Sequence, residues 1–517
     1  MTQVKSKYDA AIIKKAYKEI EDIVSPDYIT DKDFMKAAYS RNVDPAFPDR
    51  WADMIIRPGT PEEISDIMKV ANKYKIQIVP RGGGADLVGG SVTQDGILLD
   101  LTRMNQIIEI NESDFYCIVE TGITWGALLS ELQKYGLTTG VIGPGSGYAA
   151  TIGGGLSNAT AGGGSTKYGL VPDICIGVEV VLPNPEGTII RTGAAANQYA
   201  QPFCRYGLAP DFTGLFMGDV GTMGIKTKAY LKLVRDPPIK TSTTYMLNNV
   251  DYNIAAKLIH ELQKEVKEGI YNLNILPYEM VLLFKDLLGG EQVKDIEVSG
   301  PIIAVSLEAV DQGIIDIYQK KVDEIMKDDT RQFEFPEIEQ RRALARSEGF
   351  KLRDMYNAFQ GLISFMPSQI TCTTCHKIPM TSLAKVIKVA DQFEKKYKDL
   401  YPTGGMSILA GVIAILNNGH CILVGGFHGI NEDDKRKQAM DMWHKKLRFQ
   451  VRYGGIHYWL GEAISQSIVE AGAYTPQFAQ FFKDMKKTVD PNFLLSPNKF
   501  HMHSYSDKIE KYIVKDE

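Results

Sequence analysis

The chain has 517 residues, a formal net charge of −5, and a composition of 44% hydrophobic and 23% charged residues. This length exceeds what one ordinary hydrophobic core supports, so two or three folded units are expected. The slight negative charge gives no general drive toward nucleic acid. The longest apolar run, 407–416, is shorter than the roughly 18 residues that span a bilayer, so no integral membrane segment is expected.

The N-terminal region, 1–45, predicts two helices with a break at Ser25-Pro26. Lys and Glu interrupt its apolar positions, which excludes a signal peptide of the usual kind. Six cysteines in a chain of this length do not form a disulfide framework. A cytoplasmic location with reduced thiols is therefore expected.

The next region alternates between strand and helix patterns. Thr60-Pro61 opens a helix with a capping hydroxyl and a proline at the first helical position. Short apolar strands are predicted over 76–79, 96–101 and 117–120, and a further helix begins at Thr124. This alternation predicts a unit that mixes helices and sheets.

Two glycine-rich stretches interrupt this pattern, PRGGGADLVGG over 80–90 and GPGSGYAATIGGGLSNATAGGGSTKYG over 143–169. Glycine lets the backbone approach a ligand closely, and free amide groups bind phosphate oxygens. Both loops lie at strand ends, so we predict one extended diphosphate ligand held between them. Neither stretch has the P-loop pattern, and the first also lacks the dinucleotide-binding fingerprint.

A near-continuous apolar strand is predicted over 174–182, followed by a hairpin to 188–192. The segment 214–225 is a third glycine-bearing stretch, and it leads into a strand over 227–234. Pro237-Pro238 then marks a plausible domain boundary.

Five segments in consecutive order resemble the FAD-binding half of the vanillyl-alcohol oxidase and p-cresol methylhydroxylase (PCMH-type) flavoprotein superfamily. They are RPGTPEEISDIMKVANKYKIQIVPRGGGADLVGG, ILLDLTRMNQIIEI, VETGITWGALLSEL, the stretch 143–169 and DFTGLFMGDVGTMGIKT. The resemblance covers about residues 45–235, and KKTVDPNFLLSPNKF (486–500) is similar to the segment that returns to the flavin domain.

The resemblance implies an α+β fold of two domains. We expect N-terminal helices over 1–45, a PCMH-type FAD-binding domain over 46–236, an α/β cap or substrate domain over 237–455, and a C-terminal segment over 456–517 that packs back on the FAD domain. In the cap, helices are predicted over 254–268, 313–327, 381–397 and 431–452, and strands over 302–308, 407–416 and 420–427.

The resemblance also implies FAD as the cofactor. The first loop would wrap the pyrophosphate, the second would hold the ribityl and isoalloxazine end, and a third group would line the adenine side and the loop rim. The residues are Pro80, Arg81, Gly82, Gly83, Gly84, Ala85, Asp86 and Leu87; Pro144, Gly145, Ser146, Thr151, Gly153, Gly154, Asn158, Gly162, Tyr168 and Gly169; and Ile176, Val178, Gly224, Ile225 and Asn498. Ala85-Asp86 stand where many relatives tether FAD through a histidine, so non-covalent FAD is predicted. Other relatives attach FAD through a His or Tyr of the substrate domain, and that alternative stays open.

Cys372, Cys375 and His376 match the C-x-x-C-H haem attachment motif. Haem attachment needs an export context, and this segment leads into an ordinary strand-to-helix stretch. Incidental cysteines are favoured over haem, zinc or a redox pair.

The catalytic candidates lie in the cap and in the C-terminal segment. His457 and Tyr458 could accept a substrate proton, with Glu462 nearby and His428 as a further candidate. An aromatic core cluster with a satisfied histidine is the alternative. Arg346, one helical turn from Arg342, could bind a substrate carboxylate, although a solvated helix face is the favoured interpretation.

The resemblance extends to the glycolate and D-lactate dehydrogenase branch, whose metal-binding motif is absent here, so no metal is expected. We predict oxidation of a small 2-hydroxy acid by hydride transfer to flavin N5. The alternatives are oxidation of a para-substituted phenol or benzylic alcohol, and an FAD subunit that only relays electrons. The acceptor stays open among an electron-transferring flavoprotein, an iron–sulfur protein, a quinone and oxygen. Homo-oligomers are common among relatives.

Overall fold

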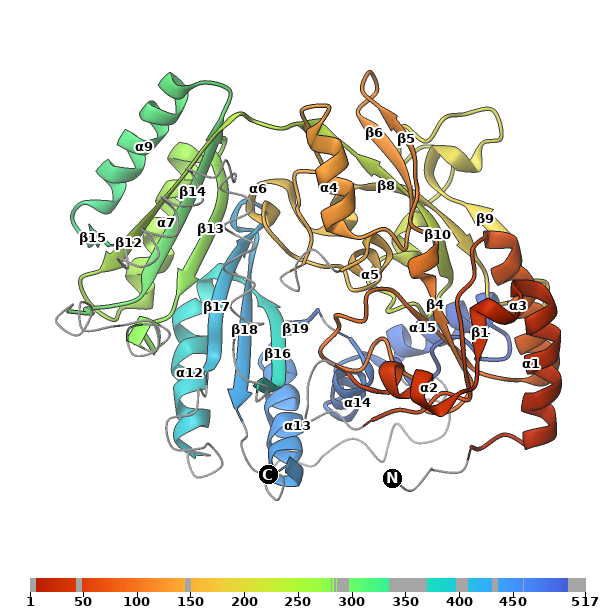
Figure 1. The fold of residues 1–517 in the computed structure, drawn as a ribbon. Coiled ribbons are helices and arrows are strands. Elements are labelled where there is room, and N and C mark those ends of the chain that lie inside the picture. Colours follow the sequence, from red (N-terminus) through yellow and green to blue (C-terminus); the bar gives the residue numbers. More distant parts are fainter. Residues whose placement is uncertain are drawn as a thin grey trace.

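The computed structural model describes residues 6–42, 49–144, 150–279, 281–282, 285, 297–333, 370–396, 408–429, 436–458 and 460–500. Figure 1 shows two lobes side by side, with the N-terminal half of the chain in one and strands β12–β19 in the other. No helix in the described part of the chain is long and apolar enough to cross a membrane.

A four-stranded sheet begins the first lobe. Its order is β1 (Ile29–Thr30), β2 (Met54–Ile56), β4 (Ile97–Asp100) and β3 (Ile78–Arg81), and the last three strands are parallel. Helices α1 (Ala10–Val24) and α3 (Pro61–Tyr74) contribute apolar side chains to the same core, and α2 (Asp33–Ser40) lies between β1 and β2 in the chain. The α3 helix begins as predicted, because the Thr60 hydroxyl accepts a hydrogen bond from the Glu63 amide.

A five-stranded antiparallel sheet completes this lobe. Its order is β5 (Ile107–Asn111), β6 (Tyr116–Glu120), β10 (Ile225–Lys232), β8 (Cys175–Val181) and β9 (Ile189–Arg191). Helices α4 (Trp125–Gln133) and α5 (Ile152–Ser157) pack into its core. A short pair, β7 (Leu137–Thr138) with β11 (Val234–Arg235), leads toward the second lobe.

The second lobe is the cap, built on an eight-stranded sheet in the order β15-β12-β14-β13-β17-β18-β16-β19. The strands are β12 (Ile239–Leu247), β13 (Ile270–Leu276), β14 (Ile302–Ala309), β15 (Thr330–Gln332), β16 (Ile370–Ile378), β17 (Ile408–Leu416), β18 (Cys421–Gly429) and β19 (Ile456–His457). The helices that pack with it are α7 (Tyr252–Val266), α9 (Gln312–Met326), α12 (Leu383–Lys396) and α13 (Arg436–Arg452).

The sequence did not predict β12 and β13. The first half of β12 is Thr- and Ser-rich and only half-buried, so it lacks the apolar run used to recognise the other strands. Both β12 and β13 pair with β14, and this tertiary pairing stabilises strands that the local sequence pattern does not indicate.

The chain finally leaves the cap and returns to the first lobe. The strand β19 is the edge strand of the cap sheet, and α14 (Glu462–Glu470) and α15 (Pro476–Val489) follow it. The segment after α15 then joins β3, because the Ile78 amide donates to the Leu494 carbonyl (2.9 Å) and the Ser496 amide donates to the Ile78 carbonyl (2.8 Å). The return of this segment was predicted from the sequence.

Candidate cofactor site

The first glycine-rich loop leaves β3 at Arg81 with a run of free backbone donors. Within the described part of the chain, the amide groups of residues 82–87 donate no hydrogen bond. These residues are partly or fully exposed, whereas 76–79 before them and 88–93 after them are buried. Backbone donors of folded proteins are normally satisfied, and consecutive free amides in a turn form an anion-binding nest. The loop therefore fits the diphosphate of the predicted cofactor.

Two side chains hold this loop in shape. The Asp86 carboxylate accepts hydrogen bonds from the Val88 amide (3.2 Å) and from the Gly90 amide, and these bonds hold residues 86–90 in a turn. Burial raises the pKa of Asp86, and the two amide bonds oppose that shift. The Arg81 guanidinium donates to the Ser91 carbonyl (3.1 Å), so the start of the loop is bonded to the residue that follows this turn.

The second glycine-rich stretch touches the first. A Cβ atom added to Gly82 would lie 2.1 Å from Thr151 Oγ1, so only glycine fits there. The Thr151 hydroxyl accepts a hydrogen bond from the Gly154 amide (3.2 Å) at the start of α5, and the Gly153 amide donates to the Thr121 carbonyl (2.8 Å). The two loops are therefore adjacent, as one extended ligand would require.

Other predicted cofactor residues of the second stretch have close local contacts. Asn158 donates from Nδ2 to the Gly154 carbonyl (3.3 Å), while its buried Oδ1 has no partner among the described residues. Gly162 lies so close to the Gly143 carbonyl that no side chain fits, and it pairs with Pro144 in a β-bridge. Gly145 and Ser146 lie outside the described residues.

Tyr168 and its neighbours join the second loop to the cap. The Tyr168 hydroxyl donates to Glu308 Oε1 (2.5 Å) on β14, and Lys167 Nζ lies 2.9 Å from the same oxygen. Burial and the Glu308 carboxylate raise the pKa of Tyr168. One residue earlier, the buried Thr166 hydroxyl donates to the Ile415 carbonyl (2.7 Å) and accepts from the Leu273 amide (3.0 Å). The second loop is thus fixed to three cap strands, β13, β14 and β17, by its own side chains, and Gly169 follows with φ +85°.

The residues expected at the adenine side lie in or beside the packed core. Val178 and Ile225 are fully buried, and Gly224 faces the Val180 side chain, while Ile176 is only half-buried. Asn498 is half-buried in the returning C-terminal segment.

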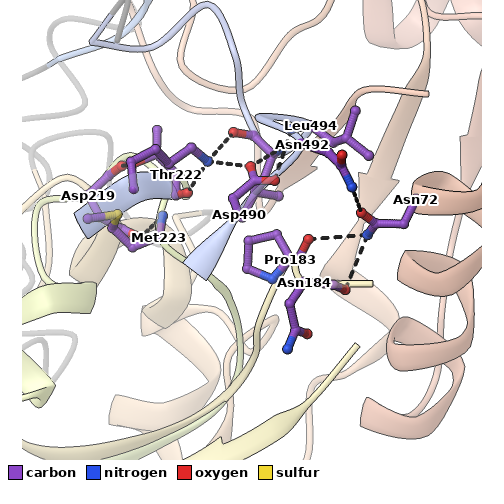
Figure 2. A network of polar contacts seen from close by, with 11 residues as sticks. Asn72, Pro183, Asn184, Asp219, Thr222, Met223, Asp490, Asn492 and Leu494 are labelled. Atoms are coloured by element: carbon purple, nitrogen blue, oxygen red, sulfur yellow. Dashed lines mark hydrogen bonds and ion pairs between the residues drawn. The ribbon is translucent and has the colours of Figure 1, made fainter. Parts of the chain in front are cut away.

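Sequence reasoning missed the buried lysines behind these loops. Lys226 Nζ lies 2.6 Å from Asp219 Oδ1 and donates to Ser157 Oγ (3.0 Å), next to Asn158. Figure 2 shows the neighbouring network, in which Thr222 and Asp490 lie close together. Lys486 Nζ donates to the Thr222 carbonyl and to Asp490 Oδ2, both at 2.6 Å. The local sequence around these lysines carries no signal of their burial, because their partners lie in distant segments.

The predicted catalytic histidine, His457, lies inside the cap. It pairs in register with His376 across β19 and β16, and the ring centroids are 5.8 Å apart. His376 Nε2 is 2.9 Å from the Tyr453 hydroxyl on the turn after α13, whereas neither ring nitrogen of His457 has a hydrogen bond of normal geometry within the described residues. Burial lowers the pKa of His457 to about 4 and also lowers the pKa of His376, to which His457 and Lys446 contribute. Both rings are therefore neutral near neutral pH.

The other catalytic candidates are placed as follows. Tyr458 is buried, and its amide donates to the Cys375 carbonyl (3.3 Å). Glu462, in the first turn of α14, pairs with Arg50 at 2.6 Å. His428 belongs to β18, but its side chain is outside the described part, and Arg346 lies entirely outside it. Their catalytic roles remain predictions.

The C-x-x-C-H motif lies on β16. Cys375 is buried, which raises the pKa of its thiol, and the side chain of Cys372 is outside the described residues. Across the described ranges, no group of three or more His, Cys, Asp or Glu side chains is arranged to hold a metal ion.

Comparison with known proteins agrees with this geometry. Residues 52–193 match the family model of the FAD binding domain. This chain therefore contains an FAD binding domain. It is 34% identical to the glycolate oxidase subunit GlcD of Bacillus subtilis over 256 residues, which cover 48% of this chain and 52% of that protein. It is 27% identical to the mitochondrial D-lactate dehydrogenase [cytochrome] of Arabidopsis thaliana over 86% of this chain and 73% of that one.

Solved structures confirm the fold. The 4-ethylphenol oxidase of Gulosibacter chungangensis superposes with a TM-score of 0.78 at 18% identity, covering 96% of this chain and 98% of that one. p-Cresol methylhydroxylase superposes with a TM-score of 0.77 at 17% identity and the same coverage. The predicted two-domain PCMH-type fold and the FAD cofactor are thus confirmed, while the chain spans only about half the length of the glycolate oxidase subunit.

Proposed function

We propose that this flavoprotein oxidises a small 2-hydroxy acid, such as D-lactate or glycolate, and passes the electrons to a separate acceptor. The observation that carries the proposal is the run of free amides over 82–87, which lies against Thr151 inside a matched FAD binding domain. The substrate class is supported by the names of the relatives, which include a glycolate oxidase subunit and several D-lactate dehydrogenases.

The chain's own groups have definite tasks in this proposal. FAD, when bound, supplies the hydride acceptor. The amides of 82–87 would hold its diphosphate, while Asp86 and Arg81 keep the loop in shape. Attachment is proposed to be non-covalent, because Ala85-Asp86 offer no histidine in this loop. Colour that stays with acid-precipitated protein would contradict non-covalent attachment.

We place the proton acceptor in the segment 456–462. A general base must come within hydrogen-bond reach of the proton that it removes. His457 lies in a closed cluster with His376, so a substrate would reach it only if that cluster opened. Tyr458 follows directly and is the first residue to change. Tyr458→Phe is expected to lower substrate-dependent flavin reduction at least tenfold while FAD remains bound.

An anaerobic absorbance titration tests the substrate. Purified protein would receive D-lactate, L-lactate, glycolate and 2-hydroxyglutarate, followed by 4-hydroxybenzyl alcohol and p-cresol. We expect a hydroxy acid to bleach the oxidised flavin band. Bleaching by the phenols alone would contradict the hydroxy-acid proposal and favour the benzylic alternative. Bleaching only by a protein partner would favour an electron-relay subunit.

The acceptor, the homo-oligomer and the cytoplasmic location stay predictions. Stopped-flow oxidation of the reduced protein with oxygen, a quinone analogue and an iron–sulfur protein would rank the acceptors by rate.

A further inference from the structure

The first glycine-rich loop is held from behind by the C-terminal segment. Lys499 is 2% exposed, and its Nζ donates to the Gly89 carbonyl (2.6 Å) and to the Val92 carbonyl (3.4 Å). Both carbonyls belong to the buried arm that follows the free amides of 82–87. An ammonium group so deeply buried is costly unless its hydrogen bonds are formed, so its position is tightly constrained.

The same arm of the loop contacts the segment that leads out of the cap. A Cβ atom on Gly461 would lie 2.3 Å from the Val88 carbonyl oxygen and 2.7 Å from the Gly90 amide nitrogen. Val88 and Val92 pack in one apolar cluster with residues of α13 and α14. The arm over 88–92 is therefore enclosed by protein, whereas the amides of 82–87 have no acceptor among the described residues.

The charges around Lys499 favour this arrangement. Burial lowers the pKa of Lys499, the Glu462 and Asp86 carboxylates oppose that shift, and Arg50, which pairs with Glu462, adds to it. Asp86 in turn holds the Gly90 amide, next to the carbonyl that Lys499 binds. Lys499 thus binds the carbonyl, and Asp86 binds the amide, of the peptide group between Gly89 and Gly90.

We propose that Lys499 is a positioning residue for the diphosphate-binding loop. Its ammonium group holds the carbonyls of Gly89 and Val92, which keeps the amides of 82–87 directed at the diphosphate of FAD. Docking of the C-terminal segment and FAD affinity are therefore coupled. This inference rests on FAD binding at this loop, and it adds a residue more than 400 positions away in the sequence to the binding apparatus.

The test compares FAD and ADP binding by apoprotein of four full-length proteins. They are the wild type, Lys499→Met, Lys499→Arg and the control Lys487→Met, which changes an exposed lysine of α15. Dissociation constants come from fluorescence titration, and melting temperatures are recorded with and without saturating FAD. Hydrogen bonds to charged groups are individually strong, so Lys499→Met should weaken FAD and ADP binding at least tenfold.

The Arg variant can donate to the same carbonyls and should bind FAD within about threefold of wild type. Lys487→Met should match wild type. If Lys499→Met is folded and binds FAD as tightly as wild type, the inference is overturned. If it does not fold, Gly461→Ala replaces it, since a methyl group there pushes the same arm of the loop. Unchanged FAD affinity in that variant would then overturn the inference. Wild-type protein that binds no FAD would instead overturn the proposed function.

Discussion

Two regions of this molecule contain unpaired polar groups, and they differ in what surrounds them. In the first glycine-rich loop, residues 82–87 are partly or fully exposed, and their amides have no hydrogen-bond acceptor among the described residues. In the cap, the ring nitrogens of His457 and Nδ1 of His376 are enclosed in a core. The cavity beside His376 is about 10 Å³, which is room for about one water molecule.

This difference in surroundings decides whether unpaired polar groups can bind a ligand or only lower the stability of the fold. Unsatisfied donors beside open space can be satisfied by a ligand, whereas unsatisfied groups in a closed core lower the stability of the fold. We therefore expect the loop to bind a ligand, and we expect protonation of the histidine pair to lower the stability of the fold.

The largest expected effect is on the pH dependence of stability. The pKa of His457 is about 4 in the folded protein, against an ordinary value of 6.5. Between these values the unfolded chain binds a proton that the folded chain does not, so stability is full above pH 6.5 and falls as the pH decreases toward 4. The lowered pKa of His457 alone should reduce the free energy of unfolding by on the order of 2 kcal/mol as the pH falls from 7 to 5. Urea unfolding monitored at both pH values measures this loss.

Among the described residues, several polar groups lie beside the histidine pair. They are His376 on the neighbouring strand, Lys446 and Gln450 on α13, and Tyr453, and the α12 side chains that line the cavity are apolar. His457→Phe should flatten the pH dependence, whereas His420→Gln, at an exposed histidine, should leave it unchanged. An equal pH dependence in His457→Phe would show that the enclosed pair does not control acid stability.

The second effect concerns the open site. Gly82→Ala places a methyl group against the Thr151 hydroxyl and forces the two glycine-rich loops apart. Overpacking of this kind costs about 1–3 kcal/mol, so FAD affinity should fall about 10- to 100-fold. Gly313→Ala near the start of α9, where the nearest atom to a new methyl group is 3.3 Å away, is the control. FAD titration of the apoproteins compares them, and wild-type affinity in Gly82→Ala would show that the loops need not touch.

The sequence predicted the features of this molecule that lie within single segments of the chain. The glycine-rich loops, their flanking strands and the PCMH-type fold were predicted because the loop chemistry is contiguous in the chain. The Thr60 cap of α3 and the return of 486–500 to the first lobe were also predicted. Such features are local, or they belong to segments that a resemblance identifies as a block.

The parts that were not predicted depend on long-range partners. Lys499 and Gly89 are separated by 410 positions, and Lys486 and Thr222 by 264. No local pattern distinguishes a buried lysine from an exposed one. Likewise, His457 stood out as a catalytic candidate because aromatic and glycine residues surround it, but only the pairing of β19 with β16 shows that its ring faces His376.

The smallest effect tests how the enclosed pair is held. Tyr453 contacts His376 Nε2 at 2.9 Å, and Tyr453→Phe removes that hydrogen bond while keeping the aromatic ring. The loss of one buried hydrogen bond should reduce the free energy of unfolding by about 1 kcal/mol at pH 7. Tyr199→Phe, at a side chain that is 88% exposed, should change it by less than about 0.5 kcal/mol. FAD affinity should be the same in both variants, because none of the contacts found for the cluster among the described residues reaches the loop amides. Weaker FAD binding in Tyr453→Phe would instead mean that the histidine cluster and the cofactor loop form one coupled site.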